Sequence, residues 1–269
     1  MSKQLRPMLK VEKWLKRAFL PGMRTFRPSA VAIVITSPGG SAAQSELIHQ
    51  RVRSLAQQTG TTVYTFAEDV AASGGYWLMC AGDEMYSTAT SLVGSIGVIT
   101  AGFGLHRVLE KYEIERRVFT AGKYKDQLDP FRQVKPGEVE RVQELLSDLH
   151  ESFQEVVRST RGNKLDTSNE DDLWSGRIWT GRQAAKLGLI DSVGTVESVC
   201  KQKFGEKTVF VQCGEPPRAG LLDAFGARAP LSFGQMGWSQ GSAYQAATGA
   251  AQGFLDEVEY RSMMARYGL

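Results

Sequence analysis

The sequence predicts an α/β fold with a largely parallel sheet, and three observations carry this prediction. Residues 30–35 (AVAIVI) form an unbroken apolar run rich in β-branched residues, which is typical of a strand buried on both faces. Strand-like and helix-like segments alternate from residue 30 to residue 79. Sharp turns of small residues, such as SPGG at 37–40, separate these segments. Units in this order pair their strands in parallel through right-handed crossovers.

Hydrophobic spacing places the elements of the first half. An amphipathic helix is predicted over 11–19, and the strand over 30–35 follows it. Residues 47–55 then carry apolar side chains along one face of a second helix. A second strand is predicted over 61–66, and a helix that includes residues 76–79 follows a short stretch of small residues.

The second half begins with a glycine-rich stretch over 94–104, which a predicted strand over 115–119 follows. A long helix is predicted over 135–161, because a proline opens it and apolar residues recur at helical spacing. Thr180 and Gln183 have the spacing of a capping box, which predicts the start of a short helix. No internal repeat is visible.

These elements divide the chain into three regions. Residues 1–29 form a basic amphipathic helix with its lead-in. Residues 30–214 form the α/β domain, whose last predicted strand covers 208–211. Residues 215–269 form a linker rich in glycine and alanine followed by a helix near the end of the chain, so we expect a C-terminal helical arm.

Composition excludes several classes of protein. The chain has 269 residues, 42% of them hydrophobic and 23% charged, which is ordinary for a soluble globular protein. Cys80, Cys200 and Cys213 are far apart and lack C-x-x-C spacing, so we expect reduced cysteines and neither a disulfide framework nor a zinc site. No cofactor or metal is predicted. No apolar stretch approaches the roughly 20 residues of a membrane-spanning helix.

Charge is concentrated at the amino end. Residues 1–30 contain eight basic residues and one acidic residue, a net charge of +7, whereas the remaining chain carries −4. Three interpretations stay open. The charges line the solvated face of an ordinary helix, they belong to a targeting segment, or residues 1–20 contact an anionic membrane surface. We therefore expect a cytoplasmic or membrane-peripheral location, with organellar targeting left open. No nucleic-acid module accompanies the charge, so no nucleic-acid partner is predicted.

The sequence AASGG at 71–75 is the first candidate for chemistry. It follows a predicted strand and precedes a helix, and small residues at such a junction let the backbone turn sharply and a substrate approach. The hydroxyl of Ser73 would lie at a helix amino end, which favours developing negative charge. A small-residue site for helix packing is the competing interpretation.

A nucleophilic serine needs a base, and the sequence has few histidines to supply one. His49, His106 and His150 lack a local catalytic signature and are interpreted as surface residues. A lysine can serve instead if burial or nearby positive charge makes it neutral. Lys123 and Lys125 lie in a loop of small and apolar residues, although this pattern by itself is more typical of solvated loop lysines.

Four motifs together resemble one family. SPGGS at 37–41, EDVAASGGYW at 68–77, VGSIGVI at 93–99 and AGKYKDQLDPF at 121–131 are similar to the signal peptide peptidase A (protease IV) family of serine peptidases. The similarity is greatest to its short SohB-like branch. It extends from about residue 11 to residue 210. It implies a Clp-protease/crotonase-like fold, which is a spiral of β-β-α units.

The resemblance also implies roles for individual residues. Ser73 matches the nucleophile, and Lys125, 52 residues later, matches the general base, with Lys123 ranked lower. Ser95 matches the serine that orients the lysine. Gly40 and the N–H group of Gly74 match the oxyanion hole. The family further implies a homo-oligomeric ring in which the serine and lysine of one site can come from neighbouring chains.

The sequence thus predicts a serine endopeptidase with a Ser–Lys dyad that acts on signal peptides or membrane-associated polypeptides. Two other hypotheses stay open, a catalytically inactive ring-forming scaffold and a crotonase-type acyl-CoA enzyme. One departure motivates the scaffold hypothesis, because the family has another strand before the helix over 11–19. Either that strand is dispensable or the sequence starts inside a longer protein, and its absence would leave a sheet edge uncovered.

Overall fold

A computed structural model describes residues 14–20 and 28–213 of the chain. Residues Ala30–Val199 form one compact unit, and the fold described below is the fold of this unit. Trp14–Phe19 is helical, as predicted. The basic residues before position 14, the predicted linker and the predicted C-terminal helix lie outside the described residues, so the expected membrane contact and helical arm stay predictions.

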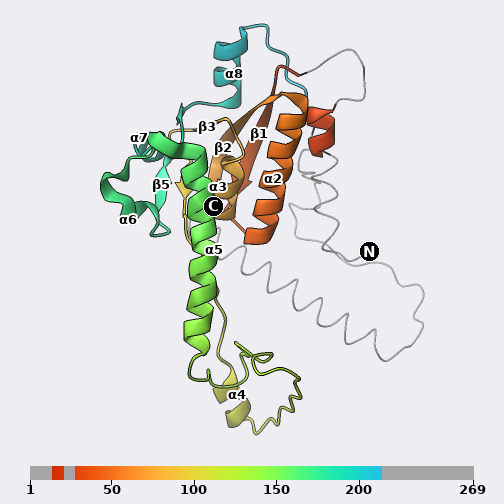
Figure 1. The fold of residues 1–269 in the computed structure, drawn as a ribbon, viewed down its shortest axis with the longest axis vertical. Helices are drawn as coiled ribbons and strands as arrows, with labels where there is room; N and C mark the ends of the chain where they lie inside the picture. Colours follow the sequence, from red (N-terminus) through yellow and green to blue (C-terminus); the bar gives the residue numbers. More distant parts are fainter. Residues whose placement is uncertain (1–13, 21–27, 214–269) are drawn as a thin grey trace, which may run out of the picture. The chain divides into compact units, whose positions relative to one another are not determined.

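The centre of the unit is a six-stranded sheet (Figure 1). Its strands are β1 (Ala30–Ser37), β2 (Thr62–Ala72), β3 (Glu84–Ser87), β4 (Leu92–Gly94), β5 (Ile178–Thr180) and β6 (Ser192–Val193). The order is β5-β4-β2-β3-β6, and β1 also pairs with β2. All pairs are parallel except β4 with β5. Strand β2 is therefore the central strand of the sheet, because β1, β3 and β4 all pair with it.

Seven helices accompany these strands in the described part of the chain after residue 28. They are α2 (Ala42–Thr59), α3 (Gly74–Met79), α4 (His106–Lys111), α5 (Glu138–Arg161), α6 (Glu170–Leu173), α7 (Gly181–Lys186) and α8 (Val196–Phe204). The short helix α3 contacts β1, β2, α2 and α5, so it lies at the centre of the packing. Trp77 of α3 stacks on Phe153 of α5 with ring centroids 4.9 Å apart. Both side chains are buried in the main hydrophobic core.

The predicted α/β fold is confirmed, and so are several of its elements. β1 and β2 contain the two predicted strands, although β2 continues to Ala72. The predicted long helix is α5, which begins at Glu138. The capping box is present, since Thr180 accepts from the backbone of Gln183 while the Gln183 side chain accepts from the Thr180 backbone. The three cysteines are free, as expected.

Three predictions about strands are wrong. Residues 115–119 and 208–211 are irregular in the structure. Their β-branched and aromatic residues pair with none of the described strands, and β propensity forms a strand only where a pairing partner exists. β1 is not buried on both faces, because Val34 keeps 47% of its surface exposed. Among the described strands β1 pairs only with β2, which makes it an edge of the sheet.

Residues 99–137, called the extension here, lie apart from the sheet. They leave β4, form the single helix α4 and return to the start of α5. Figure 1 shows α4 beside the end of α5 that points away from the strands. Most side chains of the extension are exposed, including Phe119 at 93%. The extension therefore contributes little to the core of this unit.

Candidate active site

Ser73 lies at the sharp junction between β2 and α3. Its backbone has φ 51° and ψ −123°, a conformation that L-residues rarely adopt. The Ser73 N–H donates to the Gly94 carbonyl at 2.8 Å, and its own carbonyl accepts from the N–H groups of Tyr76 and Trp77. The surrounding hydrogen bonds thus hold a strained residue in place, which is a common property of functional sites.

The glycine turn after β1 packs directly against this serine. A methyl group added at Gly39 would lie 2.9 Å from the Ser73 Cβ atom, so only glycine fits there. A methyl group added at Gly74 would lie 3.3 Å from the Gly40 backbone nitrogen. The structure therefore brings Gly40 and Gly74 together beside Ser73. Within the described residues neither backbone N–H group donates a hydrogen bond, so both are free to bind an oxyanion.

Ser95 follows the neighbouring strand, β4, and lies at the same end of the sheet as Ser73. β4 pairs with β2 so that Gly94 lies opposite Ala72, and Ser95 and Ser73 each follow directly. Ser95 also has a positive φ of 52°, and its N–H donates to the Arg177 carbonyl at 2.8 Å. Four of the five residues predicted for the site thus lie at adjoining strand ends.

Lys125 does not join them within one chain. It belongs to the extension, its side chain is exposed, and its backbone N–H donates to the Gly122 carbonyl in a tight turn. In the described part of the chain, neither the Lys125 ammonium nor the Ser73 hydroxyl has a hydrogen-bond partner. The structure therefore separates the two residues that the sequence predicts as a dyad.

None of the three histidines replaces the lysine. His49 Nε2 donates to the Cys80 carbonyl at 3.2 Å, and burial lowers the pKa of His49. His150 Nε2 lies 3.1 Å from the Ile96 carbonyl oxygen. His106 lies on α4 in the extension. No histidine forms a hydrogen bond with Ser73.

Cys80 does not offer an alternative nucleophile. The residue is fully enclosed at the end of α3, and burial raises the pKa of its thiol to about 12. A thiol with this pKa carries almost no thiolate near neutral pH, and the thiolate is the reactive form. Cys80 is therefore unsuited to act as a nucleophile, and Ser73 stays the residue that the sequence predicts for this role.

The described residues lack two further features. They contain no group of three His, Cys, Asp or Glu side chains placed to hold a metal ion. They also contain no helix with both the length and the apolar character needed to cross a bilayer.

Sequence reasoning missed two residues of the site. Gly39 makes room for Ser73, and the Gly94 carbonyl holds its backbone. Both stand in the quoted motifs SPGGS and VGSIGVI. The sequence signal for Gly39 was the pair of glycines in SPGGS, but the sequence does not say which of the two packs against Ser73.

Comparison with known proteins supplies the family. The family model for peptidase family S49 matches residues 55–209, which include Ser73, Ser95 and Lys125. The chain belongs to peptidase family S49. The names of its relatives place it with the signal peptide peptidase A proteins, near SohB. The mixed parallel and antiparallel sheet agrees with the Clp-protease-like fold of S49 peptidases.

Three relatives illustrate the S49 similarity. Serine protease SPPA, chloroplastic, of Arabidopsis thaliana is 33% identical over 195 residues, which are 70% of this chain and 28% of that protein. Probable protease SohB of Haemophilus influenzae is 30% identical over 180 residues, which are 67% of this chain and 50% of that protein. A protein named Na(+)/H(+) antiporter NhaA from Brucella abortus is 43% identical over 242 residues, 89% of this chain and 31% of that protein. The chain thus spans half or less of these relatives.

Proposed function

We propose that this chain is a serine endopeptidase in which Ser73 attacks the peptide carbonyl and Lys125 serves as its general base. The observation that carries the proposal is the strained Ser73 beside Gly40 and Gly74, whose backbone N–H groups have no hydrogen-bond partner among the described residues. Membership of family S49 supports peptide bonds as the target.

The proposed chemistry needs no cofactor. Neutral Lys125 takes the proton of the Ser73 hydroxyl as the oxygen attacks the carbonyl carbon. The N–H groups of Gly40 and Gly74 stabilise the negative oxygen of the tetrahedral intermediate. Lys125 then gives the proton to the departing amine, and a water molecule hydrolyses the acyl-enzyme by the reverse sequence. Ser95 orients the lysine.

We further propose that Lys125 acts on the serine of a neighbouring copy in a homo-oligomeric ring. The separation of Lys125 from Ser73 within one chain supports this arrangement. The extension also exposes large apolar side chains, and exposed apolar surface is typical of an interface. These side chains are Ile99, Phe103, Tyr112, Ile114 and Phe119.

The name of one relative supports a proposal for the substrate class. One is named putative signal peptide peptidase SppA, from Enterococcus faecium. We propose cleaved signal peptides or membrane-associated polypeptides as substrates of this chain. Detergent-solubilised signal peptides and matched soluble peptides, compared by mass spectrometry, would separate these from general peptide cleavage.

Complementation between two inactive variants tests the shared site. When expressed alone, S73A should abolish peptide cleavage and K125A should reduce it to a small residual rate. When the two are co-expressed, mixed rings contain sites with an intact serine from one copy and an intact lysine from the other, so activity should return. Rings of S73A co-expressed with S73A,K125A are the control, and these should stay inactive.

Labelling with a fluorophosphonate probe decides between the enzyme and an inert scaffold. Covalent labelling of Ser73 in the wild-type oligomer supports the enzyme, and absence of labelling at any probe concentration supports the scaffold. Full activity of K125A would refute the lysine as base. Failure of co-expression to restore activity would refute the shared site.

A further inference from the structure

The turn that carries Lys125 is fixed on both sides of the lysine. On the amino-terminal side, the Tyr124 ring lies against the Arg141 guanidinium, 4.2 Å from ring centroid to Cζ. On the carboxyl-terminal side, the Asp126 carboxylate accepts from Lys135 Nζ at 2.6 Å and from Arg132 Nε at 3.1 Å. Among the described residues the exposed lysine side chain between these two anchored residues has no hydrogen-bond or ion-pair partner, so the contacts hold its backbone and leave its amine available.

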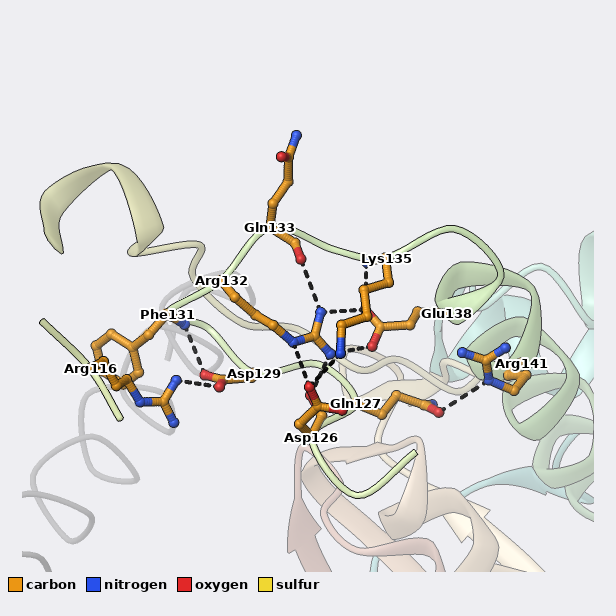
Figure 2. A network of polar contacts seen from close by, with 10 residues as sticks. All are labelled: Arg116, Asp126, Gln127, Asp129, Phe131, Arg132, Gln133, Lys135, Glu138 and Arg141. Carbon is orange, nitrogen blue, oxygen red and sulfur yellow. Dashed lines mark hydrogen bonds and ion pairs between the residues drawn. The ribbon is translucent and has the colours of Figure 1, made fainter. Parts of the chain in front are cut away.

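Arg132 is the centre of these contacts (Figure 2). Its guanidinium donates to the Asp126 carboxylate and, at 2.5 Å, to the Asp126 backbone carbonyl. It also donates to both carboxylate oxygens of Glu138, one of them at 3.0 Å. A planar guanidinium that binds two partners in fixed directions sets their relative position, which a single ammonium cannot do.

Glu138 ties this cluster to the long helix. It is the first residue of α5, its side chain is only 3% exposed, and it also accepts from the Lys135 N–H at 2.8 Å. The hydrogen bonds from Arg132 lower the pKa of Glu138 to about 2, so its carboxylate is charged near neutral pH. The core residue Phe153 stands on the same helix. The Lys125 turn is thereby connected to a rigid element that reaches the core.

The burial of this cluster is unusual for the extension. Most of the extension is exposed, yet its Arg132 and Asp126 side chains, and that of Glu138 at the start of α5, are each 20% exposed or less. An exposed ion pair contributes little and moves freely, whereas a largely buried, multiply bonded set of charges holds one geometry. The cluster is therefore suited to fixing a position.

We propose that the Arg132–Asp126–Glu138 cluster positions Lys125 for proton transfer, so that Arg132 is a positioning residue of the active site. This inference rests on the proposed function, because it assumes that Lys125 is the base. A base displaced by about 1 Å from its productive position can lose roughly a hundredfold in rate. The cluster would act on the rate of the chemical step and not on the binding of the peptide.

The central test is R132A in the intact oligomer. We expect kcat for a peptide substrate to fall about 10- to 100-fold with KM little changed, and fluorophosphonate labelling of Ser73 to slow in parallel. Guanidinium ions at low millimolar concentration should restore part of the rate, whereas equal sodium chloride or urea should not. A general loss of stability would not respond to guanidinium in this way.

Comparing the rates of the single and double variants provides a second test. If Arg132 acts through Lys125, the double variant K125A,R132A should be no slower than K125A. R158A is the matched control, because Arg158, on α5, is likewise an arginine paired with a glutamate, here the exposed Glu170. R158A should keep wild-type kcat and show no response to guanidinium.

D126N covers the case in which R132A does not assemble, since it removes a charge from the cluster and leaves Arg132 in place. It should lower kcat with the oligomer mass unchanged. Wild-type kcat in both R132A and D126N, loss of the oligomer in both, or a further rate loss when R132A is added to K125A would each overturn the inference. Full activity of K125A would instead refute the proposed function.

Discussion

Replacing Arg161 by alanine should strongly destabilise the α/β unit. Arg161 ends α5, and its side chain is only 1% exposed. Its Nε donates to the Gly188 carbonyl at 2.6 Å, and its two terminal nitrogens lie 2.9 and 3.3 Å from the Asp191 carboxylate oxygens. The contact joins the end of the long helix to the segment before β6. R161A leaves the Asp191 charge and the buried Gly188 carbonyl without their main partner.

The expected size follows from this burial. Removing one partner of a buried ion pair costs about 3–5 kcal/mol in the free energy of unfolding. Each kcal/mol lowers Tm by about 2–4 °C in a domain of 150–250 residues, so R161A should lower Tm by roughly 6–20 °C. Arg158 lies one turn earlier on α5 and pairs with exposed Glu170. R158A should cost only a small fraction of this, because exposed pairs contribute little.

The assay is thermal and urea unfolding of both variants, followed by circular dichroism. Its pH dependence gives an independent check. Burial raises the pKa of Asp191, but hydrogen bonds from Arg161, Lys164 and the Met85 N–H outweigh burial and leave the pKa below its ordinary 3.8. The stabilisation is therefore present above pH 3.8 and lost as pH falls through the lower folded pKa. The wild type and R161A should converge in acid. Equal Tm losses in R161A and R158A would refute the reasoning.

Three other predictions concern the site, the cluster and the extension. G74A should reduce both stability and peptide cleavage, since the added methyl would lie 2.5 Å from Ser45 Oγ and close to the Gly40 nitrogen. The double variant S45A,G74A should recover Tm but not kcat. Recovery of both would contradict the oxyanion role. Arg132 lowers the pKa of Glu138 from 4.5 to about 2, so wild-type Tm should fall more steeply between pH 4.5 and 2 than that of E138Q, and parallel curves would count against the pairing. F119D should lower the oligomer mass in light scattering without changing the secondary structure of the protomer, because this side chain is 93% exposed; an unchanged mass would remove Phe119 from the proposed interface.

Local rules predicted much of the fold. The capping box at Thr180 and the helical spacing of α5 depend on residues a few positions apart, so the sequence could place both. The turn at Ser73 was also predictable, because small residues between a strand and a helix permit few other backbones. The predicted strand over 115–119 failed for the opposite reason. A strand needs a partner from elsewhere in the chain, and residues 115–119 pair with none of the described strands.

The sequence by itself determined the chemistry available to this S49 protein. Its motifs specified a serine at a glycine-rich junction, two glycine turns and a lysine loop, because these depend on residue type and spacing. Only the tertiary structure decided which groups meet. In that structure β4 pairs with β2, and this pairing places Gly94 and Ser95 beside Ser73. Lys125 lies on the extension instead, and its turn is connected to α5 through the hydrogen bonds of Arg132. These contacts join residues distant in the sequence, and their geometry depends on strand pairing and packing that no local pattern contains.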